Sequence, residues 1–429
     1  SQYKDSNTIP VVAFDGLDSI EQLQLFMDIN ENQKAVSANL RLDLEEDLYW
    51  DSPVAASRLK ALRSSIIKQI AYSQNGPLYN KISVGEERSI LSFKPFSTAL
   101  LKSGLLPIAK GNKYDESSVM PALYDVNNHN HPKEMEKCKK KVVQLLNFCY
   151  DFVEERYRSV FEREKYFIVS DRGTYAFITL IGSLNTFLIN KKELSRSSPP
   201  KERFESLEKY LDAVLQKIST LTKENEDKYL SLLGAGADVK WLRFFQSIVN
   251  DKYSDYNPED LVDWKERQDG ELQDSGRRFG EAIETHMKHV ILDTLKLSYG
   301  EDWEVEIASI KRECVKRASE EQEKNYKDGL GNEEIEWTTK FTIMDYKKII
   351  EQHWSKPRRE EGDAFKYFQE GFAIDVGLGF NSKAEKIKWI AQFNKYRNLW
   401  AHKGTKEKGL NKDEVEFLKK VYDFFELNG

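Results

Sequence analysis

Apolar residues recur at helical spacing along most of this chain. They fall at i, i+3, i+4 and i+7, which places them on one face of each predicted helix. The predicted helices span residues 55–71, 132–163, 173–188, 201–222, 240–250, 257–268, 275–298, 304–327, 343–353, 364–372, 383–401 and 412–427. From about residue 270 onward, the pattern predicts helices with little else between them.

Strand signals are confined to the first hundred residues. The apolar run 9–14 stops at a turn and predicts a short buried strand. Asp18 or Ser19 is suited to cap the helix that follows. Residues 76–92 contain short β-like pieces, and the Ser/Pro-rich stretch 195–200 is the clearest loop. The pattern therefore predicts an α+β, mainly helical protein.

Composition narrows the class of protein. Apolar residues make up 40% of the 429 residues and charged residues 32%, which is typical of a globular chain. No apolar stretch approaches the ~18 residues that a membrane span needs, so we expect no membrane partner. The net charge of −6 excludes a globally basic nucleic-acid coat and leaves only a local patch. Cys138, Cys149 and Cys314 are too few for a disulfide frame and favour a cytoplasmic protein.

The strongest chemical signal lies at the end of the helix predicted over 383–401. Asn398 and His402 are four residues apart and share a face, and Arg397 lies about 100° round the helix. The stretch 383–408 holds eight basic and two acidic residues. Within it, the lysines expected to attract phosphate groups of a nucleic acid are Lys395, Lys403, Lys406 and Lys408.

An arginine and a histidine together suit RNA cleavage. His402 titrates near neutrality, so it can move the proton of a ribose 2′-hydroxyl or of the leaving oxygen. Arg397 offers a planar fork to the phosphate oxygens, where charge builds in the transition state. The simpler alternative is that His402 only caps the helix and interacts with its dipole.

Residues 397–402, Arg-Asn-Leu-Trp-Ala-His, resemble the Arg-x4–6-His signature of the HEPN superfamily. The preceding helix 275–298, the segment 344–354 and the last helix fit the order of helices in that family. The resemblance implies an all-α helical bundle and a metal-independent ribonuclease site made of Arg397, His402 and Asn398. It also implies a homodimer, no cofactor, and products with 2′,3′-cyclic phosphate ends. Many members of the family are inactive interaction modules.

Residues 26–33, Phe-Met-Asp-Ile-Asn-Glu-Asn-Gln, resemble the later half of the DGQHR-domain family, whose DndB-type members share a ParB-like α/β core. Residues 76–78, 171–173 and 233–237 agree with it. The Asp-Gly-Gln-His-Arg motif that should precede the first strand is absent, so we expect that part upstream or in a separate chain. The expected domains are a ParB-like region with a helical extension, 1–262, and a HEPN-like domain, 263–429.

Together the resemblances imply a prokaryotic defence or genome-conflict protein. A C-terminal ribonuclease domain acting on RNA would be coupled to a region that senses DNA or binds a DNA-modification or defence protein. The alternative is a non-catalytic DNA-binding regulator or scaffold that uses the HEPN domain for dimerisation.

Other candidates have simpler interpretations. Residues 234–237 lack the Lys-Ser/Thr of a phosphate loop and are expected at a helix end or turn. His129 and His131 have no second pair of ligands nearby, so we expect them in a solvated loop. His286 and His289 lack a Cys or acidic partner at ligand spacing, so we expect surface or core-edge positions. We expect Trp241, Phe244 and Phe245 in the core, with base stacking as the alternative. Glu281 and Glu284 are both candidates to reach Arg397.

Overall fold

The chain divides into two compact units. The computed structural model describes residues 15–18, 21–23, 25, 38–84, 89–162, 167–231, 236–331, 333–356, 367–401 and 409–427. The first unit is Ser1–Leu261 and the second is Val262–Gly429. The sequence analysis placed this division between residues 262 and 263. The strand expected over 9–14 lies outside the described residues, as does Ser19.

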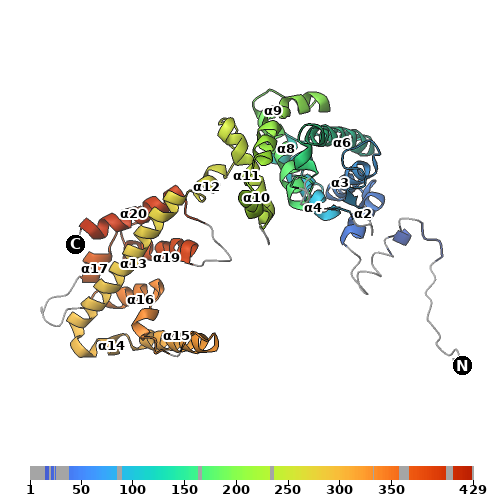
Figure 1. The fold of residues 1–429 in the computed structure, drawn as a ribbon. Helices are drawn as coiled ribbons and strands as arrows, with labels where there is room; N and C mark the ends of the chain where they lie inside the picture. Colours follow the sequence, from blue (N-terminus) through green and yellow to red (C-terminus); the bar gives the residue numbers. More distant parts are fainter. Residues whose placement is uncertain are drawn as a thin grey trace. The chain divides into compact units, whose positions relative to one another are not determined.

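The first unit is mainly helical (Figure 1). Its longer helices are α2 (Ala38–Tyr49), α3 (Ala55–Tyr72), α4 (Phe93–Lys102), α6 (His131–Arg156), α8 (Asp171–Asn190), α9 (Pro200–Ser219), α10 (Lys223–Leu230) and α11 (Ala237–Lys252). The short elements α5 (Glu116–Val119) and α7 (Arg158–Phe161) join them, and α12 (Leu261–Glu266) follows. The described strands form a parallel pair, β1 (Ile82–Ser83) with β2 (Leu91–Ser92), and an antiparallel pair, β3 (Ala109–Lys110) with β4 (Lys113–Tyr114). An α+β, mainly helical fold is therefore confirmed.

Helix α8 lies at the centre of the first unit. Most of its side chains are buried, and α4, α9 and α11 pack around it. A helix that is apolar nearly all round must be covered on every side. Gly182 lets α8 approach the end of α4 closely, because a Cβ atom there would lie 1.8 Å from the backbone oxygen of Ser103. The ring of Trp241 stacks on Phe167 at 4.5 Å, so the predicted core position of this tryptophan is confirmed.

The Ser/Pro-rich loop is anchored to α8 by a buried arginine. Arg203 on α9 is 1% exposed and donates to the backbone oxygens of Ser195 and Ser198 and to the side chain of Asn185 on α8. Arg196 in the loop donates to the backbone oxygen of Tyr124 at 3.0 Å. The loop is therefore held by hydrogen bonds to two separate parts of the unit.

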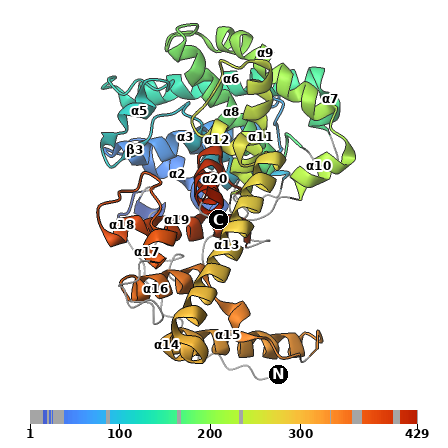
Figure 2. The ribbon, with the colours of Figure 1, turned by 90° about the vertical axis from the view of Figure 1, so that its left-hand side faces the viewer.

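The second unit is built on α13 (Gly270–Tyr299), against which α16 (Ile343–His353), α19 (Lys388–Ala401) and α20 (Lys412–Leu427) pack (Figure 2). The shorter elements are η1 (Gly300–Asp302), α14 (Trp303–Glu306), η2 (Trp337–Lys340), α17 (Tyr367–Phe372) and α18 (Lys383–Lys386), and α15 (Ala308–Lys327) lies beyond α14. Ile283, Met287, Ile291 and Leu295 of α13 are buried at a spacing of four residues and form the centre of this core.

Several predicted helices are shorter or interrupted, and the one predicted over 304–327 is divided at Ile307 into α14 and α15. The helix predicted over 132–163 breaks at Tyr157, whose hydroxyl group donates to Asp212 at 2.6 Å. The helix predicted over 257–268 begins only at Leu261, because Asp260 has a φ of +62°. The helix predicted over 383–401 is divided at Ile387, which is fully buried.

Asp18 caps its helix as predicted, since its carboxylate accepts from the backbone N–H of Glu21 at 2.9 Å.

Cys138, Cys149 and Cys314 are buried free thiols, as expected. Among the described helices, none is both long and apolar enough to cross a membrane.

Candidate active site

Arg397 and Asn398 lie on the last turns of α19. A capping box of Ser382 and Glu385 starts the preceding short helix α18. Buried Ile390 and Phe393 hold α19 to the core of the unit, so the polar positions of its last two turns face outward. Arg397 is one-third exposed and Asn398 is exposed.

A carboxylate on α13 holds the guanidinium of Arg397. Nε donates to Oε2 of Glu284 at 3.2 Å, and Nη2 donates to Oε1 at 3.3 Å. This is the two-point geometry in which a carboxylate fixes the plane of a guanidinium. Of the two glutamates that the sequence left open, Glu284 is therefore the partner of Arg397. The pair contributes less than about 1 kcal/mol to stability, because both side chains are about one-third exposed.

Tyr346 of α16 is buried and interacts electrostatically with both members of this ion pair. Burial and the negative charge of Glu284 raise the pKa of Tyr346 well above its usual range, and Arg397 partly offsets this. The phenol therefore stays neutral at physiological pH. No sequence pattern pointed to Tyr346, because it looks like any apolar-face position of a helix.

Two glycines let the segment around the motif approach α13 closely. A Cβ atom at Gly280 would lie 2.2 Å from the indole of Trp400, and one at Gly276 would lie 2.3 Å from the side chain of Leu410. Gly276 and Gly280 are about one helical turn apart. Trp400 and Leu410, which stand before and after residues 402–408 in the sequence, therefore both lie against the same stretch of α13.

Hydrogen bonds hold the chain at Gly409 and Leu410. Arg267 donates to the backbone oxygen of Gly409 at 2.6 Å and pairs with Glu414 at 2.8 Å. The side chain of Gln273 on α13 bonds to both backbone groups of Leu410. Asn411 and Glu414 form a capping box at the start of α20, with both hydrogen bonds at 2.9 Å.

The remaining site residues predicted from sequence divide into two groups. Lys395 lies on α19 and is exposed. His402, Lys403, Lys406 and Lys408 lie outside the described residues. The structure therefore places Arg397, Asn398 and Lys395 on one helix. It also identifies Glu284 as a further residue of the site, because Arg397 donates two hydrogen bonds to it.

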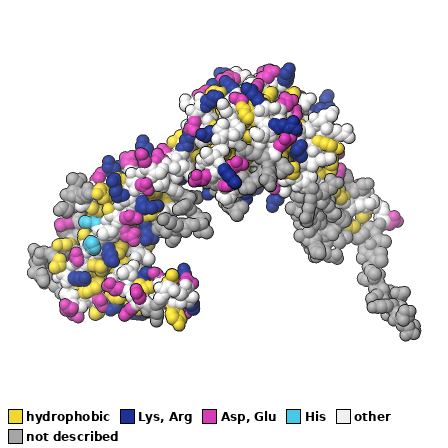
Figure 3. All heavy atoms as spheres, viewed as in Figure 1, with side chains coloured by type: hydrophobic (Ala, Val, Ile, Leu, Met, Phe, Trp, Pro, Cys, Tyr) yellow, Lys and Arg dark blue, Asp and Glu magenta, His cyan; other side chains and the backbone are white. Residues whose placement is uncertain are grey.

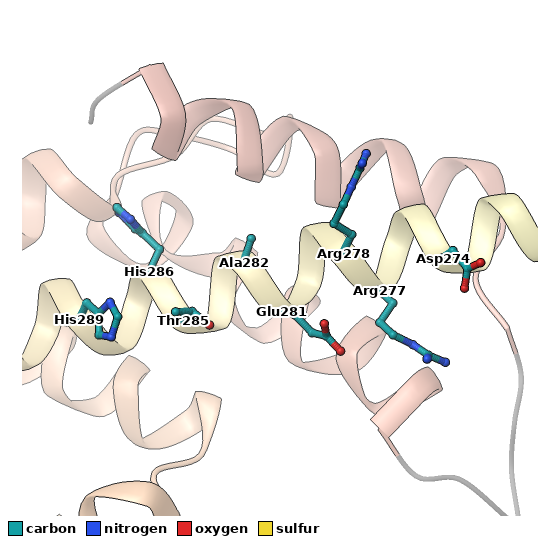
Figure 4. Close-up of a pocket in the computed structure, with 8 residues that line it drawn as sticks. All are labelled: Asp274, Arg277, Arg278, Glu281, Ala282, Thr285, His286 and His289. Atoms are coloured by element: carbon teal, nitrogen blue, oxygen red, sulfur yellow. The ribbon is translucent and has the colours of Figure 1, made fainter.

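The exposed face of α13 carries a shallow groove (Figure 4). Its volume is about 630 Å³. It is lined by Asp274, Arg277, Arg278, Glu281, Ala282, Thr285, His286 and His289. The ring of His286 lies 4.4 Å from that of Phe425, and burial together with His289 lowers the pKa of His286. His286 is partly buried at the edge of the core and His289 is exposed, which agrees with the surface or core-edge positions expected for the pair.

The other sequence candidates have structural roles. His129 is exposed, and Nδ1 of His131 lies 3.4 Å from the hydroxyl group of Tyr124. No group of possible metal ligands is found among the described side chains. Gly236 has a φ of +96° and stands at the N-cap of α11, which is the helix-end position expected for it.

In the motif at 171–173, Asp171 accepts a hydrogen bond from the backbone of Ser92 at 2.6 Å. Gly173 is needed because a Cβ atom there would lie 1.8 Å from the backbone oxygen of Phe167. These two positions are thus explained by packing at the start of α8.

No protein-family model, curated protein or solved structure matches this chain. The function must therefore be inferred from the geometry of the site and from the sequence motif.

Proposed function

We propose that the second unit is a metal-independent ribonuclease of the HEPN type. The observation that carries this proposal is the two-point ion pair between Arg397 and Glu284, which orients the arginine of the Arg-x4-His motif. A guanidinium has five N–H donors. Glu284 engages two of them, so three are not engaged by it and can bind phosphate oxygens.

The chemistry follows from the two motif residues. Arg397 would neutralise the charge that builds on the non-bridging phosphate oxygens during in-line attack by the 2′-hydroxyl. His402 would act as general base at that hydroxyl or as general acid at the leaving 5′-oxygen. The products would carry a 2′,3′-cyclic phosphate and a 5′-hydroxyl, and this route needs no cofactor.

One arginine and one histidine supply only one of the two proton-transfer groups that in-line cleavage uses. We therefore propose a homodimer through the second unit, in which two protomers bring two copies of His402 and Arg397 to a shared cleft. Trp389 is excluded from its interface, because it is fully buried in its own unit and donates to the backbone oxygen of Phe372.

The first unit would sense DNA or bind a DNA-modification or defence protein. Basic and acidic side chains are interspersed on the face of each unit seen in Figure 3. A partner that binds this face would therefore be recognised by a local pattern of groups, since no field of one sign covers it.

A non-catalytic role is the second candidate, and one observation favours it. Arg397 is already engaged by a carboxylate, as are arginines that serve only to join two helices. In that case the protein would be a DNA-binding regulator or scaffold, and the second unit would serve for dimerisation.

An assay of RNA cleavage in EDTA distinguishes the two. We expect cleavage by the parent protein, loss of it in Arg397→Ala, and a large reduction in Arg397→Lys, because an ammonium group cannot make two-point contacts. Arg312→Ala removes an exposed arginine of α15 and serves as the matched control. Parent protein that leaves RNA intact, or Arg397→Ala that cleaves like the control, would exclude this ribonuclease site.

A further inference from the structure

The first unit contains a basic cleft that the proposed ribonuclease does not use. Helices α2, α3 and α4 frame it, and each of them packs against the other two (Figure 1). Its volume is about 330 Å³, which is near the lower end of small-molecule sites in proteins. A ligand of modest size would therefore fill it.

Each of the three helices presents one face to the cleft. Leu42 and Glu45 of α2 are three residues apart, as are Lys60 and Arg63 of α3. The lining positions of α4 are 94, 97, 98 and 101, which repeat at i, i+3, i+4 and i+7. Three helices that pack against one another therefore hold the backbone of the lining in place.

Arg63 carries a buried positive charge. It is 9% exposed, and its guanidinium forms no hydrogen bond or ion pair within the part of the chain that the structure describes. Burial lowers the pKa of Arg63 and the negative charge of Glu45 opposes this, but an arginine keeps its proton at physiological pH. Buried charges in folded proteins are normally paired. An anionic ligand in the cleft would supply the partner.

The terminal nitrogens of Arg63 can be reached from the cleft. Its Nε atom is enclosed by the protein and is not available to a ligand. Nη1 and Nη2 are not among the enclosed polar atoms that lack a partner, and the side chain lines the cleft. Since these two nitrogens carry four of the five N–H donors, the guanidinium can offer a two-point contact to an oxyanion through them.

Two lysines add to the positive charge of the lining. Lys60 and Lys94 are exposed, and neither forms an ion pair with a carboxylate that the structure describes. With Arg63 they give three basic side chains against one acidic side chain, Glu45, so the lining carries a charge of +2. Like charges gathered around one cleft repel one another, and an anion with two charges would offset this repulsion.

Ser97 adds a neutral donor. It is 7% exposed, its hydroxyl oxygen is not among the enclosed atoms, and no hydrogen bond of this hydroxyl group is found among the described residues. Thr98 already donates to the backbone oxygen of Lys94 at 2.9 Å. Ser97 can therefore donate to a ligand, whereas the proton of Thr98 is engaged.

We propose that this cleft binds a phosphate group with two negative charges, held by Arg63 at its base with Lys60 and Lys94 beside it. A terminal phosphate suits the cleft better than an internal phosphodiester, because its three free oxygens can enter while the rest of the ligand stays outside. The apolar side chains of Leu42 and Leu101 offer a surface to an organic group attached to the phosphate. The site lies in the first unit and holds whether or not the second unit cleaves RNA.

Titration calorimetry on the full chain at constant ionic strength tests the proposal with inorganic phosphate, adenosine 5′-monophosphate and adenosine as separate probes. We expect phosphate or the monophosphate to bind with a Kd below about 1 mM, and adenosine not to bind. Tighter binding of the monophosphate would identify a phosphomonoester as the ligand, and equal affinity would identify free phosphate.

A DNA oligomer with a 5′-hydroxyl end carries only internal phosphodiesters and serves as a fourth probe. If it binds and neither small phosphate does, the assignment to a terminal phosphate is overturned. Absence of binding by both small phosphates, or adenosine that binds as tightly as its monophosphate, would also overturn the proposal.

Arg63→Met gives the decisive comparison. It keeps an unbranched side chain but removes the buried charge, so the melting temperature without phosphate should be unchanged or raised. Phosphate affinity should fall at least about tenfold, since a hydrogen bond between charged groups is lost. Lys94→Ala changes an exposed side chain and should lower the affinity several-fold, whereas Lys217→Ala, on the exposed face of α9, should bind like the parent. Equal affinity in Arg63→Met and the parent, or in Lys94→Ala and Lys217→Ala, would overturn the proposal.

Discussion

Trp400 of α19 lies directly against the backbone of α13 at Gly280. A Cβ atom at Gly280 would come within 2.2 Å of the indole Cζ2 atom. Glu284 lies one turn further along α13 and Arg397 about one turn earlier on α19, and these two form an ion pair. The two helices are therefore antiparallel, and the glycine sets how closely the motif helix approaches.

Gly280→Ala should separate α13 from α19. Overpacking of this kind destabilises a protein by about 1–3 kcal/mol. Hydrogen–deuterium exchange of α13 and α19 peptides should become faster, while peptides of the first unit stay unchanged. Gly371→Ala is the control, because a Cβ atom there would meet nothing within 4 Å. Its helix should be stabilised by up to about 1 kcal/mol. Equal exchange in Gly280→Ala and the parent would show that the indole can move aside without cost.

Glu284→Gln should reduce RNA cleavage about tenfold or more. The change keeps the size of the side chain but removes the charge that orients Arg397, and small misplacements of a catalytic group lower rates steeply. The rate of single-turnover cleavage measures this. Glu281→Gln, three residues earlier on the same helix, should cleave like the parent. If both variants cleave equally, Glu284 does not position the arginine.

Removal of α20 by truncation after Gly409 should unfold the second unit. Val415, Leu418, Val421 and Phe425 are buried, and the helix lies mainly along α13. Leu418→Ala is a milder test and should cost about 2–5 kcal/mol. Lys420→Ala on the exposed face should change stability by less than about 0.5 kcal/mol. A truncated chain whose α13 amides remain protected from exchange would contradict this.

The second unit should lose stability as the pH falls below about 6.5, the ordinary pKa of histidine. His353 is 3% exposed, and burial lowers its pKa, with the hydrogen bond to Ile349 and nearby Glu306 opposing and Lys356 assisting. Below pH 6.5 the unfolded chain therefore binds a proton that the folded chain does not, so stability falls with pH until the folded pKa is reached.

Urea unfolding of the second unit between pH 5 and 8 measures this loss. His353→Phe should flatten the profile, because its titrating group is gone. His289→Phe changes an exposed histidine and should leave the slope as in the parent. An unchanged slope in His353→Phe would assign the loss to another group.

Mixed dimers should recover cleavage from two inactive variants. Arg397→Ala and His402→Ala each lack one group, but a heterodimer joins the intact Arg397 of one protomer to the intact His402 of the other. Activity should rise with the fraction of heterodimer when the two are mixed. Sedimentation that shows a fully active monomer would contradict the shared site.

Long helices could be predicted from the sequence wherever one face is apolar and the ends carry caps. The predicted bounds of α16 and α20 agree with the structure. Among the longer helices, α2, α4 and α10 were missed. In α4, Phe93, Pro95 and Phe96 oppose a helical interpretation, and burial against α8 outweighs this local preference.

The site was predictable only in part, for a physical reason. Arg397 and Asn398 belong to one short motif and can be found by spacing. Glu284 is 113 residues away, and which of two acidic side chains faces α19 depends on how α13 is rotated. Nothing in the sequence distinguishes Tyr346 from other positions on the apolar face of a helix, because its interaction with Glu284 and Arg397 depends on how the helices pack.

The hydrogen bonds of Arg203 affect where a protease can cleave this chain. The Ser/Pro-rich stretch 195–200 has the composition of a linker, and its Arg196 and Lys201 are potential trypsin sites. Yet the hydrogen bonds of Arg203 and Arg196 hold that stretch against the rest of the first unit. Proteases need several residues of extended, accessible chain, so brief digestion should spare this loop. Fragments designed to end there would divide a single folded body.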